Sequence, residues 1–107
     1  MAAAVLLALA SCSTIDPNNR VAAWPDLRVV EHYVSGAEMY AQCKRYVSAG
    51  MLPLGCAAFH LDAGECHLWF DERPARWVVE HERMHCLGYD HVGDDSMARM
   101  YREWLAR

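Results

Sequence analysis

The sequence lacks an excess of basic residues, a CxxC cysteine pair and, after its first dozen residues, any apolar run long enough to span a membrane. Its formal net charge is −4, from 10 Lys and Arg against 14 Asp and Glu. Because the two signs are interspersed, a nucleic-acid partner held on a basic face is disfavoured. The missing CxxC spacing disfavours a zinc site made of cysteines. The absence of internal repeats and low-complexity segments predicts a single domain, over residues 27–107.

One short segment predicts a metal site, HERMHCLGYDH. Positions i and i+4 of an α-helix lie on the same face, so His81 and His85 can aim two imidazoles at one metal ion. Glu82 projects toward the same side and can sit beside a zinc-activated water without binding the ion. Gly88 suits the end of the helix because glycine tolerates the left-handed conformation, and the turn can bring His91 round as a third ligand. Three protein ligands and one open position are typical of catalytic zinc.

This segment resembles the HExxHxxGxxH zinc signature of the metzincin metallopeptidases and matches every fixed position of it. The resemblance implies one zinc ion held by His81, His85 and His91, with Glu82 as general acid and base. It covers eleven of the 107 residues and therefore says little about substrate.

A second family shares part of the pattern. The run Gly88–His91, with the histidines before it, resembles the three-histidine motif of the small bacterial rRNA maturation factors, which are metal-dependent endoribonucleases. Those proteins typically lack a glutamate directly after the first histidine, so Glu82 favours hydrolysis of the metallopeptidase type. Metzincins also carry a methionine turn beneath the metal, which Met97 or Met100 could supply only in a compressed form. Asp90 could orient a liganding histidine or be an ordinary turn residue.

The flanking patterns predict an α+β domain. Strands are expected at Leu27–Val34, Leu54–His60 and Glu65–Phe70, and helices at Gly36 to about Ser48, about Ala75–Leu87 and Ser96–Ala106. Across the four-residue loop of the hairpin, Phe59 should face Cys66 and Ala57 should face Leu68. The order resembles a minimal zincin-like domain, a small sheet with a backing helix, an active-site helix and a C-terminal helix. In that arrangement the last strand before the metal helix borders the cleft, and a peptide could pair with its edge.

The first residues resemble the signal of a bacterial lipoprotein. Residues 1–10 form an uncharged apolar run that is too short to span a bilayer, and the run leads into Leu-Ala-Ser-Cys, which resembles a lipobox ending at Cys12. The resemblance implies a signal peptide over residues 1–11, a lipid on Cys12 and a lipidated tether over residues 12–26. A buried N-terminal helix is the alternative. A serine directly after the cysteine, here Ser13, resembles the sorting signal of lipoproteins of the outer membrane, where the protein would face the periplasm.

Four cysteines remain if Cys12 carries lipid. An even number in a domain below 100 residues suggests two disulfides in an oxidising compartment, with buried free thiols as the alternative. The chain travels out along a helix or strand and returns about equally far between partners, which favours Cys43–Cys56 and Cys66–Cys86 over the other two connectivities.

Three function classes follow. The residues favour a lipid-anchored, zinc-dependent metallopeptidase of the bacterial cell envelope that acts on peptide or protein substrates. A non-catalytic zinc-binding envelope lipoprotein and a metal-dependent endoribonuclease are the alternatives, and the latter requires a cytosolic location. His32, His60 and His67 lie on or at the end of predicted strands and are expected to be solvated or structural rather than ligands.

Overall fold

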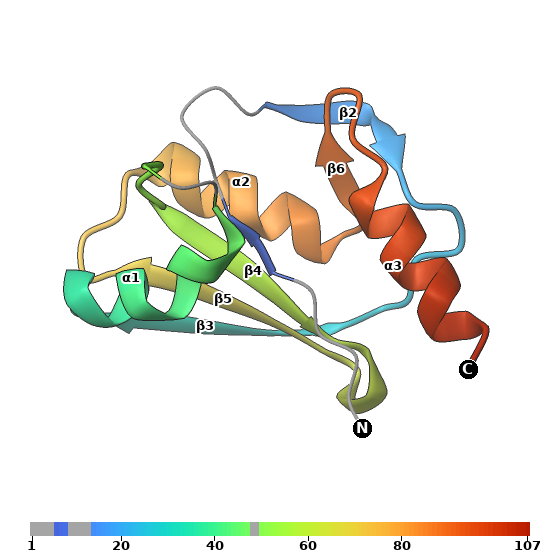
Figure 1. Ribbon diagram of the computed structural model, residues 1–107, viewed down its shortest axis with the longest axis horizontal. Helices are drawn as coiled ribbons and strands as arrows, with labels where there is room; N and C mark the ends of the chain where they lie inside the picture. Colours follow the sequence, from blue (N-terminus) through green and yellow to red (C-terminus); the bar gives the residue numbers. More distant parts are fainter. Residues whose placement is uncertain (1–5, 9–13, 48–49) are drawn as a thin grey trace.

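The computed structural model describes residues 6–8, 14–47 and 50–107 of the chain. The expected lipid site at Cys12 and the expected signal cleavage before it lie outside these residues. Within the expected signal peptide, Leu6–Ala8 is a strand, so the alternative of an N-terminal helix is wrong for these three residues. The described elements are β1 (Leu6–Ala8), β2 (Ile15–Arg20), β3 (Arg28–Val34), α1 (Gly36–Cys43), β4 (Gly55–His60), β5 (Glu65–Asp71), α2 (Arg76–Cys86), β6 (Tyr89–His91) and α3 (Ser96–Leu105), with short 3-10 turns at Lys44–Tyr46 and Leu61–Ala63. They form a small α+β domain with two sheets and three helices (Figure 1).

The larger sheet has the strand order β1-β4-β5-β3. Its centre is the predicted hairpin, in which β4 and β5 are antiparallel, with Phe59 opposite Cys66 and Ala57 opposite Leu68. The register confirms the predicted apolar face. β3 adds to the other edge of β5 in parallel, which the sequence pattern did not indicate. The expectation that a peptide could pair with the edge of β5 is therefore wrong, because β5 has a strand on each side.

The helices α1 and α2 cover opposite faces of this sheet (Figure 1). Under α2 lies the main core, which includes Phe59, Leu68 and Phe70, all fully buried. Under α1 lies a smaller cluster around Met39 and the disulfide Cys43–Cys56. The two layers follow from the alternation of side chains along each strand, which sends every second residue to the same face.

The helix α1 begins as the sequence predicts but ends earlier. The hydroxyl of Ser35 accepts a hydrogen bond from the backbone N–H of Glu38 at 3.1 Å, and serine is a favoured residue at this N-cap position. The α-helix stops at Cys43 and continues only as the 3-10 turn Lys44–Tyr46. The disulfide of Cys43 with Cys56 fixes the end of α1 against β4.

A second, two-stranded sheet pairs β2 with β6 in antiparallel fashion, with Ile15 opposite His91. The following segment is also part of the fold: Val21 and Trp24 are buried in the main core, and the Trp24 indole N–H donates to the carbonyl of Cys86 at 2.9 Å. The folded domain thus includes residues that the sequence analysis assigned to a tether over 12–26. Val21 and Trp24 are large apolar residues in this otherwise polar segment, and such residues are usually buried, so the sequence did contain an indication that the segment folds.

No helix among the described residues is both long and apolar enough to cross a membrane. The second disulfide, Cys66–Cys86, joins β5 to the end of α2, so both predicted pairings are present in the structure. Two disulfides indicate an extracytoplasmic protein.

Candidate metal centre

The helix α2 places His81 and His85 one turn apart on the same face, as the i, i+4 spacing predicts. It ends at Cys86, one residue earlier than expected, and is followed by Gly88 with φ +98°. A Cβ on Gly88 would lie 2.6 Å from Cγ of Trp24, so both the backbone conformation and the close packing require glycine here. The turn then leads directly into β6, which carries His91.

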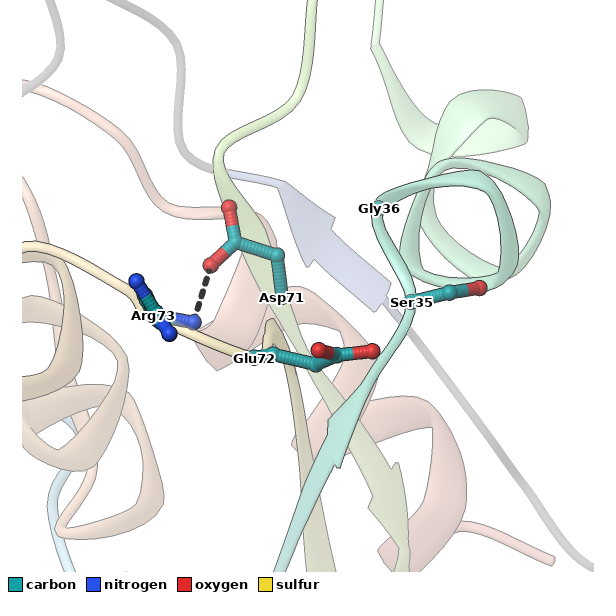
Figure 2. Close-up of a pocket in the computed structure, with 5 residues that line it drawn as sticks. All are labelled: Ser35, Gly36, Asp71, Glu72 and Arg73. Atoms are coloured by element: carbon teal, nitrogen blue, oxygen red, sulfur yellow. Dashed lines mark hydrogen bonds between the residues drawn. The ribbon is translucent and has the colours of Figure 1, made fainter.

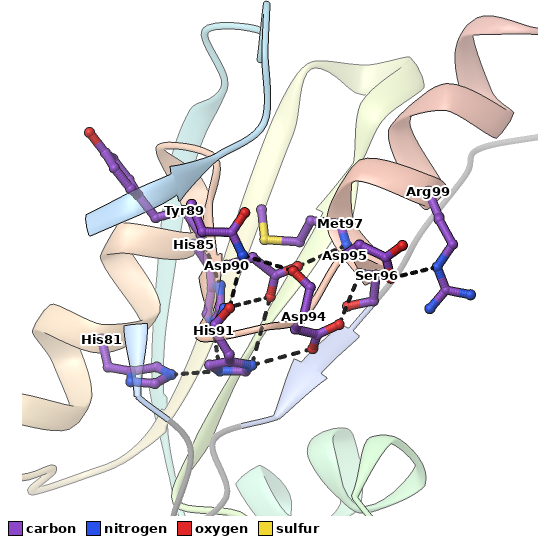
Figure 3. Close-up of polar contacts among 11 residues, drawn as sticks. His81, His85, Tyr89, Asp90, His91, Asp94, Asp95, Ser96, Met97 and Arg99 are labelled. Atoms are coloured by element: carbon purple, nitrogen blue, oxygen red, sulfur yellow. Dashed lines mark hydrogen bonds and ion pairs between the residues drawn. The ribbon is translucent and has the colours of Figure 1, made fainter. Parts of the chain in front are cut away.

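The three histidines converge on one point (Figure 3). The Nε2 atoms of His81 and His85 each lie 3.1 Å from Nε2 of His91. Two nitrogens bound at about 2.0–2.1 Å to one tetrahedral zinc ion are about 3.3–3.4 Å apart. The three rings are therefore arranged closely enough to hold a single metal ion.

Burial keeps two of these rings neutral. Desolvation, with a smaller contribution from nearby His91, lowers the pKa of His81 to about 4. The same causes, together with His81, lower the pKa of the fully buried His85 to about 3. Both rings are unprotonated at neutral pH, which is the form that binds a metal.

Acceptor groups beside the Nδ1 atoms of His85 and His91 favour the orientation of these two rings that binds a metal. Nδ1 of His85 lies 2.7 Å from the carbonyl oxygen of Tyr89, so this nitrogen carries the proton and donates it, leaving Nε2 free. Nδ1 of His91 lies 3.7 Å from a carboxylate oxygen of Asp90 and 3.7 Å from one of Asp94. Negative charge on that side of the His91 ring favours a proton on Nδ1 and a free Nε2.

Asp90 connects β6, the strand that carries His91, to the helix α3 through hydrogen bonds. Its carboxylate accepts the backbone N–H of His91 at 2.7 Å and that of Met97, in the first turn of α3, at 3.1 Å. Only 1% of Asp90 is exposed, and burial raises its pKa. Because both of its oxygens accept backbone N–H groups, Asp90 supports the position of His91 and is not itself a ligand. Met97 is fully buried in the core.

Glu82 is a buried carboxyl that no other group in the described residues satisfies. It is fully buried, neither of its oxygens has a hydrogen-bond partner in the described part of the chain, and desolvation raises its pKa well above 4.5. An unpaired buried carboxyl costs free energy unless something polar meets it. Its neighbour in sequence, His81, belongs to the histidine cluster, which could hold a metal ion.

Two other features of the described residues are weaker candidates for a functional site. Asp90, His91 and Asp94 form a second group with potential ligand atoms close together, but the backbone N–H groups already occupy both oxygens of Asp90. A surface pocket of about 410 Å³ lies where β3 and β5 end and contains no member of the histidine cluster (Figure 2). Its lining residues are Ser35, Gly36, Asp71, Glu72 and Arg73.

No protein-family model, curated protein or solved structure matches the chain. The resemblance to the metzincins therefore rests on residues 81–91 alone. What the structure adds is a buried cluster of three histidines that could hold a metal ion. The sequence predicted the members of this cluster but not the strand β6 that presents His91, nor β2, which supports it.

Proposed function

We propose that this protein is a zinc-dependent hydrolase, a metallopeptidase that cleaves peptides or proteins in the bacterial cell envelope. The observation that carries the proposal is the convergence of the Nε2 atoms of His81, His85 and His91. The first two come from the helix that also carries the buried carboxyl of Glu82, which has no hydrogen-bond partner among the described residues. Three imidazole ligands and a carboxyl that can exchange a proton with water are typical of hydrolysis by zinc.

The residues divide the chemistry between them. A bound zinc ion would supply the Lewis acid that polarises the scissile carbonyl and acidifies water. His81, His85 and His91 hold the ion, and the carbonyl of Tyr89 keeps the His85 ring in the binding tautomer. As a carboxylate, Glu82 would accept a proton from the attacking water and then deliver that proton to the leaving amine. Burial raises its pKa toward the neutral range, where a carboxyl can both take up and release a proton.

The non-catalytic alternative does not account for Glu82. A purely structural zinc site has four protein ligands and no need for a buried acid beside them. Here the protein supplies three histidines, and an unsatisfied carboxyl lies next to one of them in the chain. The endoribonuclease alternative requires a cytosolic, reducing location, which the two disulfides disfavour.

The anchor is proposed on the sequence alone. The lipobox resemblance at Cys12 supports lipid attachment in the envelope, with the catalytic domain in the periplasm. Labelling of cells with palmitate is expected to mark the wild-type protein and to be lost in Cys12→Ser. Labelling that persists in Cys12→Ser would remove the anchor from the proposal without affecting the metal centre.

The decisive experiment combines metal analysis with a peptide-cleavage assay on wild type, Glu82→Gln and His85→Ala. We expect one zinc per chain in wild type and in Glu82→Gln, and little zinc in His85→Ala. Peptide cleavage is expected only for wild type. Zinc binding with equal cleavage by Glu82→Gln would falsify the mechanism, and zinc binding without any cleavage would favour the non-catalytic alternative.

A further inference from the structure

The third histidine of the cluster is held differently from the other two. His81 and His85 lie on the helix α2, whereas His91 ends the three-residue strand β6. The backbone N–H of Asp94 donates to the carbonyl of His91 at 3.2 Å, so His91 also begins a tight turn. The position of its ring therefore depends on what holds β6 and this turn in place.

A segment from the other end of the chain supports both. Residues 14–21, which we call the N-terminal strap, run beside residues 87–94 and include β2. Two backbone hydrogen bonds of 2.9 Å fix the ends of the strap, from the N–H of Val92 to the carbonyl of Thr14 and from the N–H of Val21 to the carbonyl of Gly88. The strap thus contacts the chain on both sides of the third ligand.

The strap bulges between its two fixed ends. Ile15 and Arg20 are five positions apart on β2, but their partners His91 and Tyr89 are only two apart on β6. The extra residues of β2 have no partner of their own in the ladder, and a bulge of this kind redirects side chains. One of the redirected side chains is that of Asn19.

The side-chain amide of Asn19 joins the first and last residues of the turn. Its Nδ2 atom donates to the carbonyl oxygen of His91 at 2.9 Å and to that of Asp94 at 2.8 Å. An amide nitrogen carries two protons, so both of its donors are used. These bonds hold the backbone of His91 and place Asp94, whose carboxylate lies 3.7 Å from Nδ1 of the His91 ring.

We propose that Asn19 is a positioning residue for the third metal ligand, and that metal binding and the docking of the N-terminal strap stabilise each other. The inference rests on the metal centre of the proposed function. With its backbone fixed, His91 keeps Nε2 3.1 Å from the Nε2 atoms of His81 and His85, so an ion meets ligands that are already in place. Because such coupling is reciprocal, an ion that holds His91 must also make the strap harder to detach.

The first test is the zinc affinity of the full chain, measured by competition with a chelator. Asn19→Ala removes both donors, and Asn19→Asp keeps the shape of the side chain but turns acceptor oxygens toward two carbonyls. Both are expected to bind zinc roughly 10–100-fold more weakly than wild type. Arg20→Ala is the matched control, because it removes a different contact of the strap, from Nε to the carbonyl of Leu87 at 2.9 Å, and should leave the affinity unchanged.

The second test needs no variant. Amide hydrogen exchange at Val21 and Val92, whose N–H groups fix the strap, should be slower in the zinc-bound wild type than in the metal-free protein. Exchange rates that do not respond to zinc would overturn the coupling between the strap and the metal.

The outcomes for Asn19 and for the metal centre can be told apart. If wild type binds zinc and both Asn19 variants bind it equally tightly, the inference about Asn19 is wrong and the metal centre stands. An equal loss of affinity in Arg20→Ala would also overturn it, because the strap would then act through general stability. If wild type itself binds no zinc, the metal centre fails and this inference fails with it.

Discussion

The carboxyl of Glu82 lowers the stability of the folded protein, although the proposed reaction depends on it. This carboxyl is fully buried and has no hydrogen-bond partner in residues 6–8, 14–47 and 50–107, and desolvation raises its pKa well above 4.5. The folded protein must either keep a proton there or bury a charge, and both cost free energy at neutral pH. A residue kept at such a cost is expected to serve chemistry rather than stability.

Glu82→Gln is therefore expected to stabilise the metal-free protein at pH 7, by roughly 1–3 kcal/mol. The raised folded-state pKa means that stability from Glu82 is present below the unfolded value of 4.5 and is lost as the pH rises above it. The glutamine does not titrate, so the difference between the two proteins should vanish near pH 4 and grow toward pH 7. Urea unfolding at both pH values measures it, and a difference independent of pH would contradict the assignment.

Asp90 is expected to control how well His91 binds the metal. Asp90→Ala removes the acceptor of two backbone N–H groups and the negative charge beside the His91 ring, so zinc affinity should fall by roughly 10–100-fold. Competition with a chelator measures the affinity. Asp94→Asn, which alters only the more exposed carboxylate near the same ring, should change it less. Equal affinities for wild type and Asp90→Ala would show that this carboxylate supports the fold alone.

At the residue scale, the sequence predicted what spacing alone determines. His81, Glu82 and His85 sit on one helix, whose geometry is known before any tertiary contact forms. The role of Asp90 could not be predicted in the same way. It depends on the N–H of Met97, which reaches the carboxylate only when α3 has packed against β6. The hydrogen bond that joins His32 to His67 likewise depends on the parallel register of β3 and β5.

The elements show the same division. The hairpin β4–β5 and the helices α2 and α3 follow from local alternation and helical periodicity, and their bounds agree with the sequence within a residue or two. The strands β2 and β6 pair residues more than 65 positions apart, and β6 is only three residues long. Such a short strand has no periodicity of its own, so only the folded chain reveals it.

The tight turn at Gly88 connects α2 to β6, and a substitution there tests how much this turn contributes to stability. Gly88→Ala adds a Cβ into Trp24 in a left-handed conformation, and should cost roughly 2–5 kcal/mol of stability. Gly93→Ala is the matched control, because Gly93 has φ +72° but open space around it, and should cost about 1–2 kcal/mol. Thermal unfolding of both variants measures the difference, and similar losses would mean that the contact with Trp24 is unimportant.

For the whole molecule, the disulfides compensate for a small core. Each bridge closes a loop of moderate length, 13 residues for Cys43–Cys56 and 20 for Cys66–Cys86, and its replacement by two serines should cost about 3 kcal/mol. The costs should be similar, but the effects on the metal centre should differ. Cys86 follows His85 at the end of α2, so only loss of the Cys66–Cys86 bridge is expected to weaken zinc binding as well. Zinc titration and urea unfolding of both double variants measure this.

Equal zinc affinity in the two double variants would show that the packing of α2 on the sheet holds the ligands without the bridge. The connectivity itself was predictable because each pair lies at matching ends of consecutive elements. The parallel addition of β3 was not, since parallel pairing needs a crossover that the sequence pattern of α1 does not specify.

The pairing of Ile15 with His91 has a consequence for where such an enzyme could work. Three peptide units separate Ile15 from Cys12, and even fully stretched they reach only about 10 Å. With an acyl chain on Cys12, His91 would lie close to the phospholipid headgroups, because no long flexible linker would separate it from the membrane. Polypeptides lying along the bilayer would come within reach, and those free in the periplasm would have to come down to it.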